Sequence, residues 1–397
     1  MSERSTDLIH HGYQPPAGFE APTLPVHKAS TVFFPNVQAM RERRWDDGSS
    51  YTYGTFGTPT TYALQSRIAT LEGARHCLLT PSGLAAIAVT NLALLQAGDE
   101  VLLPDNVYRS NKALAQHELA RAGVTLKIYD AMDADSLARA IGPKTRLLWL
   151  EAAGSVTLEF PDLRRLLAIA REVGSAELTV ALDNTWGAGI AFNAFDLGAG
   201  QGVDLTVHAL TKYPSGGGDV LMGAICCVDD ALHQRLAWTH ARLGQCVAAN
   251  DAELVLRSLP SLELRYAAHD ASARALASWC LTRGEFARVM HPALPNSAGH
   301  AHWRDLCHGA AGLVAVEFQP RYASAEVDAF VDRLRLFRIG YSWAGPVSLV
   351  VPYNLPSMRA LPSGIAGVVV RFSAGLEGVA DLIADLEQAL SALPAPR

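Results

Sequence analysis

The sequence has 397 residues, of which 49% are hydrophobic and 18% are charged, and its formal net charge is −6. This length and hydrophobic content allow two domains with a large core and exclude a disordered chain. No basic run is present that would attract nucleic acid or an anionic membrane surface, so we expect a small-molecule partner.

The N-terminal sequence and the cysteines indicate the cellular context. No apolar stretch follows a basic start in MSERSTDLIHHGYQPP, and no segment approaches about 20 uninterrupted apolar residues, which predicts a cytoplasmic protein without a signal peptide or membrane span. The cysteines form no C-x-x-C pair and are typical of reduced thiols: Cys77, Cys226, Cys227, Cys246, Cys280 and Cys307. His300 and His302 lie two residues apart without an obvious third ligand, so we expect no metal site.

Residues 1–58 are rich in Pro, Thr, Tyr and Gly and show little periodicity. The sequence predicts an extended arm here. Because the arm is polar and aromatic, we expect it to pack on a second subunit rather than to fold alone.

Residues 59–253 alternate apolar runs with segments of helical period. The runs have strand length and are apolar on both faces, as buried parallel strands are: HCLLTPS, EVLLPDNVY, VTLKIYD, TRLLWLEAA, LTVALDNTW, LTVHALTKY and GAICCVDD. Segments such as DLRRLLAIAREVG have the pattern of amphipathic helices, so the fold class predicted is α/β with a doubly wound, mainly parallel sheet. Ligands bind such sheets beyond the carboxyl ends of the strands, where Tyr108, Glu151, Asp183 and Lys212 fall.

Residues 254–397 predict a smaller α+β domain. A helical stretch, SLELRYAAHDASARALASWCLTRG, precedes three strand candidates, and a last helix, EGVADLIADLEQALSAL, follows them. The strand candidates are GLVAVEFQ, SLVVPY and GVVVRFS.

Lys212 is the first candidate site residue. It is one of only five lysines, and it stands where an apolar strand runs into the glycine-rich loop PSGGGD. A desolvated amine with a lowered pKa is what carbonyl chemistry uses. The alternative is a structural lysine whose ammonium group caps the end of the strand.

Asp183 ends the buried strand of VALDNTWG. A carboxylate at that depth needs a positive partner, which the protonated ring nitrogen of a pyridine cofactor would supply. The alternative is a helix N-cap, because Asn184 and Thr185 follow.

Two further features are ambiguous when taken alone. Ser82 and Gly83 join a strand to a helix, whose first N–H groups could bind a phosphate, although Ser-Gly before a helix is common. Tyr108 ends a strand and could lie against an aromatic ring, although a tyrosine there is more often simple packing.

The order of these features resembles one known family. Nearly the whole chain is similar to the pyridoxal-phosphate (PLP) enzymes of cysteine and methionine metabolism, which have the aspartate-aminotransferase-like fold (type I). The segments that carry the resemblance are APTLPVHKASTVFF, YGTFGTPTTYALQSRIATLEG, PSGLAAIAVT, EAAGSVTLEFPDL, ALDNTWGAG, HALTKYPSGGGDVLMG, YSWAGPVSL and VRFSAGLEGVADLIADL.

The resemblance implies a role for each matching residue. Lys212 would be the Schiff-base lysine and Asp183 the partner of the pyridine nitrogen. Tyr108 would stack on the ring and assist proton transfer, and Arg371 would bind the substrate α-carboxylate. The phosphate contacts would come from Gly83, Leu84 and Thr211, and from Tyr53 of a neighbouring subunit in a homotetramer.

The sequence departs from the family pattern at two positions. Thr55 stands where the family usually has an arginine on the phosphate, and Ala209 stands where a serine is often found. We therefore expect fewer contacts to the cofactor phosphate than the family usually makes, unless Tyr51 or an arginine elsewhere compensates.

The stretch Tyr341-Ser342-Trp343 bears on the reaction. Members that act at the γ-carbon commonly have a glutamate in place of Tyr341 and a leucine in place of Trp343, whereas this chain has the form of members that eliminate a thiol from the β-carbon of cystathionine. Tyr341 and Trp343 would form an apolar wall for a thioether, with Ser342 also lining the substrate site. A γ-acting relative and a non-catalytic binding protein are the alternatives.

Overall fold

The computed structural model describes residues 4–10, 17–18, 21, 23–44, 51–391 and 393. The predicted arm (1–58) and C-terminal domain (254–397) therefore each include residues outside the described part. Within the described ranges no helix is both long and apolar enough to cross a membrane. The same residues contain no group of three or more His, Cys, Asp or Glu side chains that could hold a metal ion.

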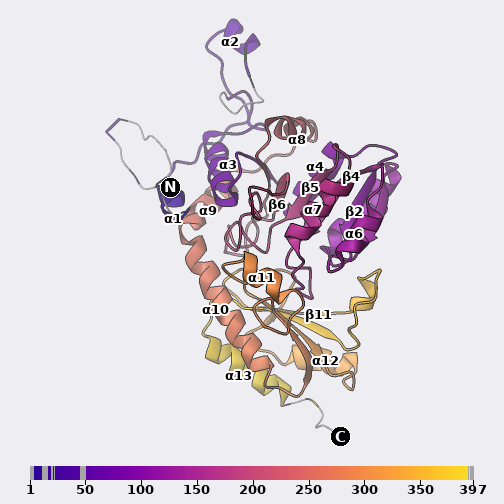
Figure 1. The fold of residues 1–397 in the computed structure, drawn as a ribbon. Helices are drawn as coiled ribbons and strands as arrows, with labels where there is room; N and C mark the ends of the chain where they lie inside the picture. Colours follow the sequence, from indigo (N-terminus) through magenta and orange to yellow (C-terminus); the bar gives the residue numbers. More distant parts are fainter. Residues whose placement is uncertain are drawn as a thin grey trace.

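The larger domain is built on a seven-stranded sheet (Figure 1). Its strands are β1 (His76–Thr80), β2 (Glu100–Pro104), β3 (Thr125–Tyr129), β4 (Thr145–Glu151), β5 (Thr179–Asp183), β6 (Leu205–His208) and β7 (Gly223–Cys227). Their order is β1-β7-β6-β5-β4-β2-β3, and only β7 runs antiparallel to its neighbours β1 and β6. The predicted mainly parallel sheet is confirmed.

Helices cover both faces of this sheet, which is why its strands are mostly apolar. One face packs against α4 (Gly83–Leu94) and α8 (Asp230–Arg242). The other face packs against α3 (Pro59–Glu72), α6 (Ala134–Ala140) and α7 (Leu163–Val173). The sequence starts each of three helices with a side-chain cap, from Thr58 to α3, Ser82 to α4 and Asp162 to α7.

The smaller domain contains a five-stranded sheet. The strands are β8 (Phe286–Met290), β9 (Leu313–Phe318), β10 (Arg338–Ile339), β11 (Leu349–Tyr353) and β12 (Val369–Ser373), in the order β10-β11-β12-β9-β8. Helices α12 (Ser324–Asp332) and α13 (Val379–Leu390) share its core with α10 (Leu262–Cys280), which runs from the larger domain into the smaller one (Figure 1).

The remaining short elements connect these layers. They are α5 (Arg109–Leu114), the π-helical turn η1 (Ala115–Leu119), α9 (Ala249–Ser258), η2 (Leu259–Ser261), α11 (His300–Leu306) and η3 (Leu355–Ser357). The predicted domain boundary at 253/254 falls inside α9, and the chain enters the smaller domain through α10.

The described part of the arm is not wholly extended. It contains α1 (Arg4–Ile9) and α2 (Val37–Arg41). Leu8 of α1 is buried in the same core cluster as Leu64 of α3, so this part of the arm packs on its own chain. The segment around α2 projects from the body of the molecule (Figure 1), and Phe33 there is 92% exposed.

Candidate active site

Lys212 lies four residues after β6, in the loop that joins β6 to β7 of the larger domain. Its Nζ atom donates a hydrogen bond to Ser342 Oγ of the smaller domain (2.8 Å) and lies 5.8 Å from the centre of the Trp343 ring. Burial and the positive charge of Arg371 lower the pKa of Lys212 to about 8, and Asp183 opposes this shift. The lysine therefore has the desolvated, partly neutral amine that the sequence predicts.

Asp183 ends β5, and its Cα atom is paired with that of Glu151 at the end of β4. Its Oδ1 atom accepts a hydrogen bond from the Thr185 N–H (3.0 Å), but no helix begins here, so the N-cap alternative is wrong. Burial raises the pKa of Asp183. A cation at this carboxyl would lower that pKa again, so the position suits the partner of a protonated ring nitrogen.

Glu151 is a buried group to which sequence reasoning gave no role. Its Oε2 atom accepts a hydrogen bond from the backbone N–H of Tyr108 (2.7 Å). Burial and the neighbouring Asp183 raise the pKa of Glu151 well above its usual range. The bond fixes the backbone of Tyr108, whose side chain is 43% exposed and available for stacking.

The turn before α4 approaches the Lys212 loop closely. A Cβ atom on Gly83 would lie 2.6 Å from the Cβ of Ala209, so the turn requires glycine at this position. The Ser82 side chain accepts from Ala85 N–H (3.0 Å), which leaves the N–H groups of Gly83 and Leu84 outside the helical hydrogen bonds. These two groups are free to bind a phosphate, and their contact with it stays a prediction.

Thr211 has a different set of partners from the one expected. Its hydroxyl donates to the Met222 carbonyl (3.1 Å) and accepts from the Met222 N–H (3.0 Å). The hydroxyl would have to turn away from the Met222 carbonyl to donate to a phosphate, so this contact stays a prediction.

Arg371 of β12 faces the same space as Lys212. Its Nη2 atom donates to the Ser342 carbonyl (3.2 Å), and its Cζ atom lies 5.4 Å from the centre of the Tyr353 ring. Burial lowers the pKa of its guanidinium group. No acidic side chain pairs with Arg371 among the residues that the structure describes, which leaves a desolvated cation able to bind a carboxylate.

The stretch Tyr341-Ser342-Trp343 reaches the site in part. Ser342 contacts both Lys212 and Arg371, and Trp343 packs edge-on against Tyr213 with ring centres 5.6 Å apart. Tyr341 is 86% exposed, so within one chain it does not form the predicted apolar wall.

Tyr53 is the one predicted cofactor contact that lies in the arm. It is 49% exposed and forms an isolated bridge with Thr31. In the described residues no hydrogen bond or ring contact links Tyr53 to Lys212 or Asp183, so its role in a neighbouring site stays a prediction.

Comparison with known proteins identifies the family of the chain. The model of a family described as Cys/Met metabolism PLP-dependent enzyme matches residues 5–391. A cystathionine β-lyase of Bordetella avium is 39% identical over 394 residues, covering 97% of this chain and 96% of that protein. One of Escherichia coli K12 is 32% identical over 390 residues, covering 96% of each.

Solved structures share the whole fold. A cystathionine γ-synthase from Xanthomonas oryzae pv. oryzae, in complex with aminoacrylate and cysteine, has a TM-score of 0.87 at 29% identity, covering 99% of this chain and 98% of its own. This fold and the family match identify pyridoxal phosphate as the cofactor. The chain therefore belongs to the PLP-dependent enzymes of cysteine and methionine metabolism.

Proposed function

We propose that the chain is a carbon–sulfur β-lyase that converts L-cystathionine and water into homocysteine, pyruvate and ammonia. The observation that carries this proposal is the group formed by Lys212, Ser342 and Arg371. It places a partly neutral amine and a desolvated guanidinium on either side of one serine, and within the described part of the chain the guanidinium has no acidic partner. An enzyme that acts on amino acids needs both groups: the guanidinium binds the substrate carboxylate, and the neutral amine removes the α-proton.

The residues would hold the cofactor and substrate as follows. Asp183 would pair with the ring nitrogen, the N–H groups of Gly83 and Leu84 would bind the phosphate, and Tyr108 would lie on the ring. Bound pyridoxal phosphate supplies the electron sink for the charge left at the α-carbon. Arg371 would hold the α-carboxylate while the Lys212 amine takes the α-proton. Lys212 or Tyr108 would then return a proton to the leaving sulfur.

Support for cleavage at the β-carbon comes from Tyr341-Ser342-Trp343. This stretch puts an aromatic residue, Trp343, next to Lys212 and supplies no carboxylate. The alternative is a γ-acting enzyme such as a γ-lyase or γ-synthase, which the similarity to the cystathionine γ-synthase structure keeps in view. A non-catalytic binding protein is disfavoured because it would need no buried lysine at a cofactor.

The products of L-cystathionine test this function. Holoenzyme that releases pyruvate and homocysteine supports the β-lyase, whereas 2-oxobutyrate and cysteine would identify a γ-lyase. A yellow protein that releases neither keto acid would contradict the proposal, and a protein that stays colourless after PLP is added would favour the binding protein.

The pKa of Lys212 predicts the pH dependence of cofactor capture. Only a neutral amine attacks an aldehyde, so capture of PLP by the cofactor-free protein should quicken by about tenfold per pH unit below the pKa. It should level off above about pH 8, where the amine is neutral. Stopped-flow absorbance measures this rate, with N-acetyl-lysine as the control. A protein rate that keeps rising in parallel with the control through pH 10 would show an unperturbed lysine.

Thr55 predicts weak cofactor retention. An arginine there would add a charge-assisted contact worth ~1.5–3 kcal/mol. Thr55→Arg should therefore lower the dissociation constant of PLP by roughly tenfold to a hundredfold. Loss of the yellow chromophore on dialysis measures this, with the uncharged Thr55→Gln as control. Unchanged or faster loss in Thr55→Arg would mean that another group already compensates.

We propose further that the arm completes the site of a neighbouring subunit, because Tyr53 and the segment around α2 are exposed on one chain. Activity should then require a dimer, and a homotetramer of two such dimers is expected. Light scattering combined with activity across a dilution series measures this. A fully active monomer would exclude it.

A further inference from the structure

One segment of the smaller domain crosses to the larger domain beside the site. This bridge segment, residues 354–361, follows β11 directly and precedes β12, the strand that carries Arg371. Its first neighbour in the chain is Tyr353, whose ring lies under the Arg371 guanidinium. The bridge segment is therefore joined directly to the residue that contacts Arg371, the group to which we assign the substrate carboxylate.

The larger domain holds the bridge segment through a buried ion pair. Lys112 Nζ lies 2.8 Å from Asp105 Oδ1, and the two side chains are 8% and 9% exposed. The lysine also donates to the Met358 carbonyl (2.9 Å), and the Asp105 carboxylate accepts from Ala360 N–H (2.8 Å) and Leu361 N–H (3.0 Å). Asp105 and Lys112 stand three residues before and four residues after Tyr108.

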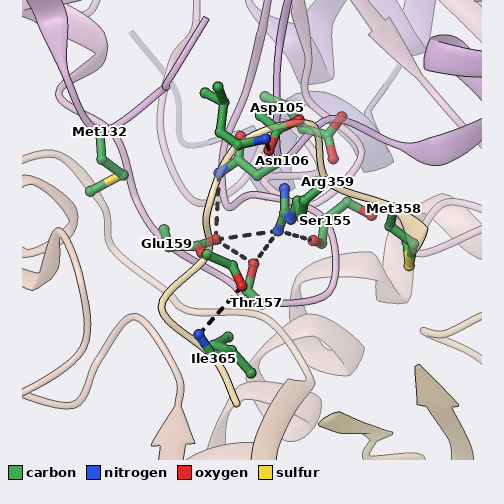
Figure 2. Close-up of polar contacts among 12 residues, drawn as sticks. Asp105, Asn106, Met132, Ser155, Thr157, Glu159, Met358, Arg359 and Ile365 are labelled. Atoms are coloured by element: carbon green, nitrogen blue, oxygen red, sulfur yellow. Dashed lines mark hydrogen bonds and ion pairs between the residues drawn. The ribbon is translucent and has the colours of Figure 1, made fainter. Parts of the chain in front are cut away.

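Arg359 makes the second attachment (Figure 2). Its Nη2 atom donates to the Ser155 carbonyl (3.2 Å) and to the Thr157 hydroxyl, and it lies 4.0 Å from Glu159 Oε2. The Thr157 hydroxyl in turn donates to Glu159 Oε2 (2.6 Å). Because the Arg359 side chain is only 8% exposed, water competes little for these contacts.

The loop that Arg359 holds is backbone-strained. Val156 and Leu158 have φ angles of 75° and 58°, a region that side chains with a Cβ rarely adopt, least of all β-branched ones. Such conformations persist only where the surroundings fix them, and they cluster at functional sites. The loop also binds the Tyr108 region, because Ser155 N–H donates to the Asn106 carbonyl (2.7 Å).

Through these two attachments, the bridge segment joins the part of the site around Arg371 to the part around Tyr108. We propose that Arg359 is a positioning residue that determines the affinity of the site for amino acids. Together with the Lys112–Asp105 pair, it fixes the distance between two halves of the site. These are the substrate-carboxylate half (Tyr353, Arg371) and the cofactor half (Tyr108, Glu151). This inference rests on the proposed placement of the carboxylate at Arg371. It predicts that substrate binding, and not cofactor retention, depends on Arg359.

The test compares three single variants of the holoenzyme, and the double variant of Arg359→Gln with Thr157→Val, with a matched control. Arg359→Gln removes the charge, Arg359→Lys keeps it, and Thr157→Val removes the hydroxyl that Arg359 contacts. Arg288→Gln is the control, because Arg288 holds the neighbouring Gly364 carbonyl (3.2 Å) and lies 3.5 Å from Glu317 entirely within the smaller domain. The measurements are KM and kcat for L-cystathionine, the Kd of glycine from the chromophore absorbance, chromophore retention on dialysis, and the melting temperature.

Arg359→Gln should raise KM and the glycine Kd by about tenfold to a hundredfold, as expected when a binding group shifts by about an ångström. Its kcat should stay within about threefold and its cofactor should be retained, because Lys212 and Asp183 are unchanged. Arg359→Lys should fall between wild type and Arg359→Gln. Thr157→Val should raise KM less than Arg359→Gln does. Added to Arg359→Gln, it should raise KM little further, because both changes remove the same contact between Arg359 and Thr157.

Arg288→Gln should leave KM and the glycine Kd unchanged. Unchanged values in Arg359→Gln, or an equal rise in Arg288→Gln, would overturn the proposal, as would losses that merely follow the melting temperature. If Arg359→Gln does not fold, Arg359→Lys and Thr157→Val carry the same predictions. Glycine binding does not depend on which bond of a substrate breaks. The glycine Kd therefore tests the role of Arg359 even if the products show that the β-lyase assignment is wrong.

Discussion

Replacing Lys212 by alanine should leave a folded protein whose turnover falls by several orders of magnitude, on the order of the losses seen when a catalytic group is removed. The variant loses both the covalent anchor of the cofactor and the base that takes the α-proton. In the cofactor-free state, where Lys212 is a free amine, the variant should also gain stability below about pH 8. There the wild type folds with a buried amine whose pKa is lowered to about 8, so the unfolded chain binds the proton more tightly than the folded one. Initial rates and thermal melts measure the two effects.

The matched control is Lys144→Ala, because Lys144 is an exposed lysine on the same domain. It should keep both turnover and melting temperature. Near-normal turnover in Lys212→Ala, with cofactor present, would remove Lys212 from the mechanism.

Replacing Arg371 by glutamine should raise KM for the amino-acid substrate by roughly tenfold to a hundredfold. A hydrogen bond to a charged group is worth ~1.5–3 kcal/mol, and each ~1.4 kcal/mol is one decade. Arg371→Lys should recover little of this, because an ammonium group cannot reproduce the two parallel bonds of guanidinium to carboxylate. Steady-state kinetics measures both variants.

A second effect of Arg371→Gln is electrostatic. Because the positive charge of Arg371 lowers the pKa of Lys212, its removal should raise that pKa and shift the pH profile of cofactor capture upward. Arg274→Gln is the control, since Arg274 pairs with Asp270 on α10 away from the site. A KM for Arg371→Gln that equals that of the control would place the substrate carboxylate elsewhere.

Much of the fold could be predicted because its signals are local. All seven strands of the larger sheet are apolar runs bounded by turn residues, and each was predicted at the position where it occurs. Strands β8 and β10 were not predicted. Ala287 and Arg288 of β8 are exposed, and β10 is two exposed residues long, so these two edge strands have no apolar run to read.

The site could be predicted only where each residue has its own local motif. Asp183 ends a buried strand, Lys212 follows a buried strand by four residues, and Gly83 begins a helix, so each is recognisable in its own segment. Arg359 has no such signal, because its partner Thr157 is 202 residues away in the chain. Tyr341 has a local motif, but the motif is not sufficient. It predicts that this side chain forms an apolar wall of the substrate site, whereas the side chain is exposed on one chain.

The most direct test of the central claim is to find which lysine carries the cofactor. Holoenzyme reduced with borohydride, digested and analysed by mass spectrometry should yield one pyridoxyl-phosphate adduct, on the peptide that contains Lys212. Lys112 is the one fully buried lysine among the described residues, and its Nζ atom is already held by Asp105 and Met358. An adduct on Lys112 would contradict the account. So would a yellow holoenzyme whose Lys212 is found unmodified after reduction.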